Sequence, residues 1–285
     1  MKIKKVITGG CSFSDSAAYY TWPHQLENYI KGIDPNVKFE HLGMAAQGQE
    51  LIQKKSMLAM IEALKEYKPE EIAVIVMWSG TTRKAFYIDD IRTIRKIVRT
   101  WERPGTLQVT KQFADLKNNL PFREIAKRDR GTIEYSENGG WYITRDGIDE
   151  EISSDYYERR IDLRIHLHVS AENMIMLQNS CKANNVRFYQ QYFMDHPYID
   201  LETNKENQLV GYLFDQIDES TILLKQGMYE YLKGHSDKLF LSLEAKDAYT
   251  YFLGKDDMHP NFIGHKKWIN DIIIPRLLED GIFDE

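Results

Sequence analysis

The chain has 285 residues, of which 42% are hydrophobic and 28% charged, a composition typical of a soluble globular protein rather than a disordered or fibrous one. Its 37 basic and 43 acidic residues give a net charge of -6, so we expect no nucleic-acid partner. The longest apolar run, residues 72–78, is far shorter than the roughly 20 residues that span a bilayer. Residues 1–10 lack the apolar core of a signal peptide, and two cysteines cannot build a disulfide framework. We therefore expect a cytoplasmic protein with no membrane span.

Short β-prone segments alternate with helical patterns along most of the chain. The predicted strands cover residues 3–8, 37–41, 72–78 and 186–193. The predicted helices cover residues 22–30, 51–64, 160–183 and 209–232, and a last helix follows a polar loop at 254–261 and is kinked or ended by Pro275. This alternation predicts an α/β fold, a three-layer α/β/α sandwich with a mainly parallel sheet covered on both faces.

Residues 84–151 break the rhythm, with dispersed charge and scattered proline and glycine. We interpret them as an insertion within a single domain of residues 1–285. The aromatic residues of the insertion favour either a lid or glycan-binding wall over a substrate site, or a plain satellite core. These aromatic residues are Phe86, Tyr87, Trp101, Trp141 and Tyr142.

Four polar loops follow predicted strands or precede the last helix. Ligands of parallel α/β sheets lie beyond the carboxyl ends of the strands, so these loops are the candidate site. They contain Gly10-Cys11-Ser12, the small-residue stretch 43–48, Gly80-Thr81 and, late in the chain, Asp256-x-x-His259. In this order they resemble the motifs of the SGNH (GDSL-type) hydrolase superfamily, whose members have a flavodoxin-like fold. Two flanking stretches, Trp22-Pro23-x-x-Leu26 and His259-Pro260-Asn261-x-x-Gly264-His265, also look like this family.

The resemblance implies a catalytic triad and an oxyanion hole. Ser12 would be the nucleophile, His259 the general base, and Asp256 the carboxylate that orients the imidazole. The backbone N–H groups of Ser12 and Gly48 would hold the oxyanion, with Gly43 as the alternative to Gly48. No cofactor and no metal are implied.

The sequence departs from the family at two positions. Cys11 stands where the family usually has aspartate, and we expect no loss of chemistry from it. Thr81 stands where the family has an asparagine that supplies a third oxyanion donor, and losing such a donor typically costs about 10²–10³ in rate. Either Thr81, Thr82 or Arg83 substitutes, or the enzyme is slow, or the site binds without hydrolysing. Arg83 could also bind an anionic group of the substrate through its forked guanidinium.

Plainer interpretations remain open for several of these residues. The Asp256-Asp257 pair could be a solvated acidic turn, with His259-Pro260 only the entry to a helix. Cys11 could be the nucleophile instead of Ser12, although at the end of a strand a core position is favoured. His166 and His168 are an unfavoured metal pair because residues two apart diverge on a helix. The remaining expectations are that His196 lies in a turn, that His265 packs beneath the site, and that Trp22 and Trp78 belong to the core.

The sequence thus predicts a serine esterase that acts on a small-molecule or glycan ester. The resemblance favours small acyl groups, above all O-acetyl groups on carbohydrate, with lipids and thioesters as competing substrates. The rival hypothesis is a non-catalytic module that binds a glycan or a partner in the same cleft, because Thr81 replaces the amide donor.

Overall fold

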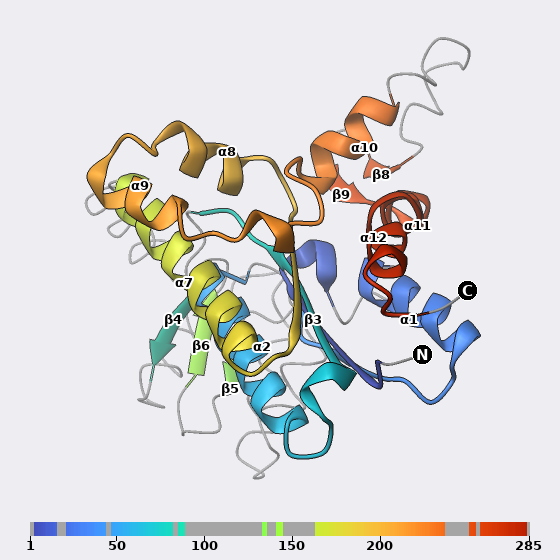
Figure 1. Cartoon of the computed structure of the whole chain (residues 1–285). Coiled ribbons are helices and arrows are strands. Elements are labelled where there is room, and N and C mark those ends of the chain that lie inside the picture. Colours follow the sequence, from blue (N-terminus) through green and yellow to red (C-terminus); the bar gives the residue numbers. More distant parts are fainter. Residues whose placement is uncertain are drawn as a thin grey trace, which may run out of the picture.

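The computed structural model describes residues 3–15, 21–43, 47–81, 163–236, 251–254 and 257–283, and three short strands at 85–88, 133–135 and 141–144. At its centre is a four-stranded parallel sheet in the order β2-β1-β3-β7 (Figure 1). The strands are β1 (Lys5–Gly10), β2 (Lys38–His41), β3 (Ile72–Trp78) and β7 (Arg187–Tyr192). The predicted α/β fold with a parallel sheet is confirmed.

Strand β1 runs two residues farther than the sequence predicts. Gly9 and Gly10 pair with Val76 and Met77 of β3, since a parallel ladder needs only backbone N–H and C=O groups. The absence of side chains also lets helix α2 (Gln49–Ala63) lie close, because a Cβ on Gly9 would approach the hydroxyl of Ser56 at 2.6 Å. The glycines therefore belong to the strand, and the turn that contains Ser12 begins after them.

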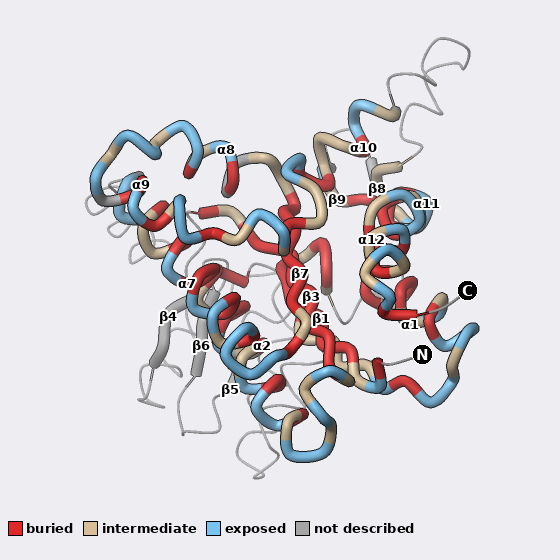
Figure 2. Tube along the Cα trace, in the orientation of Figure 1, coloured by how far each residue is buried: buried red, intermediate tan, exposed pale blue. Residues whose placement is uncertain are grey.

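Helices cover both faces of the sheet, as Figure 1 shows. On one face lie α2, α7 (Leu163–Ala183), α8 (His196–Thr203) and α9 (Gln208–Phe214), and on the other lie α1 (Trp22–Ile33), α10 (Met228–Ser236), α11 (Phe262–Trp268) and α12 (Ile274–Glu279). Each face of the sheet has its own hydrophobic core, and alternate residues of β3 belong to one or the other. Val74 and Val76 pack with α2 and α7, whereas Ile75 and Met77 pack with α1 and α11. Strands β1, β3 and β7 are almost entirely buried and the outer helix faces are exposed (Figure 2), whereas the edge strand β2 is only partly buried. This is the expected three-layer sandwich.

The predicted helix over 209–232 is wrong as one element. The structure divides the region into α9, a short 3₁₀ turn η4 (Glu219–Thr221) and α10, and it adds α8, which begins at His196 where a turn was expected. Asp218 caps η4 by accepting from the N–H of Ser220 at 3.0 Å. The chain then follows the edge of the sheet, where the N–H of Leu223 donates to the carbonyl of Gln190 at 2.9 Å. Covering the exposed edge of β7 takes precedence over continuing the helical pattern.

The polar loop expected at 254–261 is also wrong, because much of it is a hairpin. β8 (Phe252–Gly254) pairs antiparallel with β9 (Asp257–Pro260), and α11 follows directly with Asn261 as its N-cap. A π-helical turn, η5 (Ile269–Ile273), joins α11 to α12, whose first turn contains Pro275. Proline lacks the N–H that a regular helical hydrogen bond needs, so an interruption of the helix is expected close to Pro275. The π-helical turn, which is wider than a regular α-helical turn, is that interruption.

The insertion predicted at 84–151 contributes a small antiparallel sheet in the order β4-β6-β5. Its strands are β4 (Ala85–Ile88), β5 (Ile133–Tyr135) and β6 (Trp141–Thr144). Trp101 lies outside the described residues, so the question of a lid or a satellite core stays open. Within the part of the chain that the structure describes, no helix is both long and apolar enough to cross a membrane.

Candidate active site

Ser12 lies at the carboxyl end of β1, in a single 3₁₀ turn, η1 (Ser12–Ser14). The turn is closed by the N–H of Ser14, which donates to the carbonyl of Cys11 at 2.8 Å. Cys11 and Phe13 point into the core, with 0% and 1% of their surfaces exposed, whereas Ser12 is half-buried. The buried position expected for Cys11 is confirmed, and Ser12 is the residue of the turn that solvent can reach.

His259 lies on β9 and meets Ser12 across 247 residues of sequence. Its Nε2 lies 2.8 Å from the Ser12 Oγ, a distance typical of a hydrogen bond. The ring of Phe13 lies 5.1 Å from the imidazole, centroid to centroid, and Phe13 in turn packs edge-on against Phe193. The imidazole therefore has an apolar support on one side and a hydroxyl within reach. Asp256 lies outside the described residues, so its role as the third member stays a prediction.

The first turn of α1 is hydrogen-bonded both to the 12–15 segment and to helix α11, which follows His259 in the chain. The indole Nε1 of Trp22 donates to the Ser14 Oγ at 2.7 Å, and the hydroxyl of Thr21 donates to the carbonyl of Asp15 at 3.2 Å. The backbone N–H of Trp22 donates to Nδ1 of His265 on α11, at 3.2 Å. His265 and Trp22 are both buried, as expected.

The candidate oxyanion residues are Gly48 and Thr81, with Gly43 as the alternative to Gly48. Gly48 is the N-cap of α2, so its N–H and the first N–H groups of the helix have no partner within the helix. Gly43 packs directly on the backbone of Ser14, where a Cβ would overlap the carbonyl oxygen. Thr81 is 7% exposed and follows β3, whereas Thr82 and Arg83 lie outside the described residues. No contact tests the donor roles of Gly48 and Thr81.

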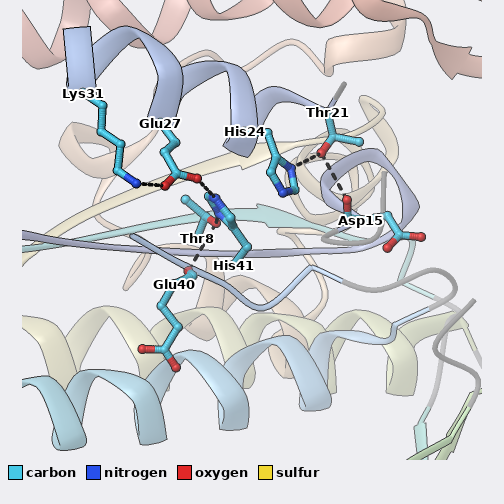
Figure 3. Close-up of polar contacts among 8 residues, drawn as sticks. All are labelled: Thr8, Asp15, Thr21, His24, Glu27, Lys31, Glu40 and His41. Carbon is cyan, nitrogen blue, oxygen red and sulfur yellow. Dashed lines mark hydrogen bonds and ion pairs between the residues drawn. The ribbon is translucent and has the colours of Figure 1, made fainter. Parts of the chain in front are cut away.

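A second chain of hydroxyl, imidazole and carboxylate joins residues of β1, β2 and α1 (Figure 3). The hydroxyl of Thr8 is 2.8 Å from Nδ1 of His41, whose Nε2 is 2.7 Å from a carboxylate oxygen of Glu27. Burial lowers the pKa of His41 and of His24, whose ring centroids lie 4.4 Å apart with the planes tilted by 44°. Thr8 is 0% exposed, so no substrate reaches it, and the network ties β1, β2 and α1 together. The sequence analysis missed these residues, because only the strand register brings Thr8 beside His41.

His166 and His168 both lie on α7, as expected. His168 pairs with Glu172 at 3.2 Å on the same helix, and His166 is buried. In the described part of the chain, no group of three or more histidine, cysteine, aspartate or glutamate side chains is arranged to hold a metal ion.

Comparisons with known proteins give no information about this site. A scan against protein-family models found no matching family, and searches of curated proteins and of solved structures found no similar chain.

The close packing of Gly43 on Ser14 yields a testable difference between two glycines. We expect Gly43→Ala to lower the free energy of unfolding by about 1–3 kcal/mol, because the backbone of Ser14 must move to admit a methyl group. Gly32→Ala is the matched control. Gly32 lies in α1, and a Cβ there would meet no atom within 4 Å. Because glycine is unfavourable within a helix, this substitution should stabilise the protein by about 0.5–1 kcal/mol. Urea unfolding followed by tryptophan fluorescence measures both. Equal effects would contradict the packing argument.

Buried His265 should make the fold sensitive to acid. Burial, together with the nearby His259, lowers the pKa of His265 to about 3. In the unfolded chain this histidine has its usual pKa of about 6.5 and binds a proton below that pH, whereas in the folded protein it stays neutral. The free energy of unfolding therefore falls as the pH drops from 6.5 towards 3. Between pH 6.5 and 5 this one group should cost about 2 kcal/mol. Urea midpoints across this range should fall less steeply in His265→Asn, and an unchanged slope would contradict the assignment.

Proposed function

We propose that the protein is an SGNH-type serine hydrolase that cleaves esters through an acyl-enzyme. The observation that carries the proposal is the 2.8 Å contact between Ser12 Oγ and His259 Nε2 at the carboxyl end of a central parallel strand. A serine hydroxyl is a weak nucleophile by itself, and an imidazole nitrogen at hydrogen-bond distance is the usual means of activating it. The half-buried position of Ser12, between a buried cysteine and a buried phenylalanine, supports the same role.

The proposed reaction has two steps. Ser12 Oγ attacks the ester carbonyl carbon while His259 Nε2 takes the hydroxyl proton, and the collapse of the tetrahedral intermediate returns that proton to the leaving alcohol. Water then attacks the acyl-enzyme, again giving a proton to His259, and the acid is released as Ser12 regains its hydrogen. Asp256 would accept a hydrogen bond from the other ring nitrogen and stabilise the imidazolium.

Backbone N–H groups would stabilise the oxyanion. Ser12 opens a 3₁₀ turn and Gly48 caps α2, so both N–H groups belong to helical starts whose amides lack partners within the helix. The positive end of the α2 dipole adds to the stabilisation of negative charge. Thr81 would contribute its hydroxyl in place of the amide of related enzymes.

The substrate we favour is a small acyl ester, in particular an O-acetyl group on carbohydrate, and the support for it is the resemblance to SGNH hydrolases. We further propose that Arg83 contacts an anionic group on the substrate. The alternative function is a binding module on the same fold, and the observation in its favour is the threonine at position 81 where an amide would be expected.

Labelling with a fluorophosphonate tests the proposed nucleophile. We expect the wild type to be modified at Ser12, Ser12→Ala to be unlabelled, and His259→Ala to react at least about 10²-fold more slowly because the general base is lost. Peptide mass spectrometry identifies the modified residue. Cys11→Ala is the control and should label normally, because Cys11 is buried. A folded wild type that does not label would favour the binding module, and labelling at another residue would reject the proposed triad.

The contribution of Thr81 can be isolated with a substitution of the same shape. Thr81→Val replaces the hydroxyl by a methyl group of similar size. We expect kcat for p-nitrophenyl acetate to fall about 10²–10³-fold with little change in KM. Ser79→Ala is the control, because its buried hydroxyl has no hydrogen-bond partner among the described residues. An unaltered kcat in Thr81→Val would show that the hydroxyl is not a donor.

A further inference from the structure

Two buried glutamine side chains flank Gly48 and are hydrogen-bonded to the residues that follow two different strands. Gln47 donates from its side-chain amide to the carbonyl of Leu42, just after β2, at 2.9 Å. Gln49 donates from Nε2 to the carbonyl of Ser79 at 2.6 Å, and its Oε1 accepts from the N–H of Ser79 at 3.3 Å. Gln47 is 0% exposed and Gln49 is 2% exposed, so water does not compete for these bonds. The backbone of Gly48 is held from both sides.

The contact made by Gln49 joins the start of α2 to the segment that follows β3. Gly10 of β1 pairs with Met77 of β3, so Ser12 and Ser79 each follow that pair by two residues at the same edge of the sheet. Gln49 is the first residue of α2, the helix that packs against both strands. Its side chain therefore ties the start of α2 to the strand end that precedes Gly80 and Thr81.

We propose that Gln49 is a positioning residue for the oxyanion hole. Its carboxamide sets the backbone of Gly48 and the segment at Thr81 in a fixed relation to Ser12. The inference rests on the proposed hydrolase function. Because threonine replaces the amide donor at position 81, the backbone donor carries a larger share of the stabilisation, and its placement matters more.

An amide is required for this double contact. A glutamine side chain offers a donor and an acceptor in one planar group, which matches the N–H and C=O of a single residue. Glutamate would keep the acceptor but set a carboxylate against the carbonyl of Ser79, and methionine would supply neither strong donor nor strong acceptor at nearly the same size.

The test compares Gln49→Met with Gln53→Met. Gln53 is one turn later on α2, also 2% exposed, and donates to the thioether of Met57 rather than to either side of the site. We expect Gln49→Met to lose about ten- to a hundredfold in kcat with KM changed less than about threefold, because the donor is displaced in the transition state. Gln53→Met should leave both constants close to the wild type. Equal losses in the two variants, or an unchanged kcat in Gln49→Met, would overturn the proposal.

Gln49→Glu provides a second variant if Gln49→Met does not fold. Its protonated form can again donate to the carbonyl of Ser79, so its kcat relative to the wild type at the same pH should recover as the pH is lowered. A ratio that does not vary with pH would contradict the role of the donor.

Hydrogen exchange separates this inference from the hydrolase proposal. If the tether holds the two segments, amides at 47–51 and 79–81 should exchange at least tenfold faster in Gln49→Met than in Gln53→Met. Unchanged exchange would reject the tether itself. A folded wild type that neither labels at Ser12 nor hydrolyses esters would reject the hydrolase function, and with it the catalytic role, while exchange still reports whether Gln49 fastens the loops.

Discussion

The contact between the first turn of α1 and helix α11 is the interaction on which the candidate site depends. The N–H of Trp22 donates to His265, and the side-chain amide of Gln25 donates to the carbonyl of Phe262 at 2.9 Å. The indole of the same Trp22 donates to Ser14 in the turn that contains Ser12. One helix start therefore fixes two segments that lie almost at opposite ends of the chain. These bonds are buried or partly buried, where an unmade hydrogen bond costs about 1–3 kcal/mol, so the segments are not free to separate.

The parallel sheet supplies the other half of the arrangement. Strands in register end at one edge, so the residues after β1 and β3 meet without any contact between distant loops. Helix α2 crosses from β2 to β3 and directs its first turn to that same edge. The first N–H groups of α2, which lack partners within the helix, therefore lie at the edge of the sheet where β3 ends, and Gln49 contacts the backbone of Ser79 there.

Among the described residues, two hydroxyl–imidazole contacts have the same short length, and burial distinguishes their roles. Thr8 and His41 are 2.8 Å apart, as are Ser12 and His259. The threonine lies inside the sheet with Glu27 completing a structural network, whereas the serine is half-buried at a strand end. Geometry alone would suggest chemistry at both places. Access to a substrate favours only the second.

Much of the fold follows from local pattern. The unbroken apolar run of β3 and the helical spacing in α1, α2 and α7 predicted these elements close to their observed bounds, because burial on one or both faces leaves a clear period in the sequence. The region at 209–232 misled that analysis, since its helical pattern is interrupted to cover the edge of β7 and no local signal reports an edge. The hairpin at β8 and β9 was missed because three- and four-residue strands carry too short a period.

The sequence by itself placed Ser12 and His259 among the candidates, because motifs next to strand ends are local features. It also predicted that Cys11, Trp22 and His265 would be buried. Only the tertiary structure decided that the serine and histidine touch, that Trp22 joins their segments, and that Gln49 reaches Ser79. Such contacts join residues far apart in sequence, and their distances depend on strand register and helix packing, which no pattern of neighbouring residues encodes.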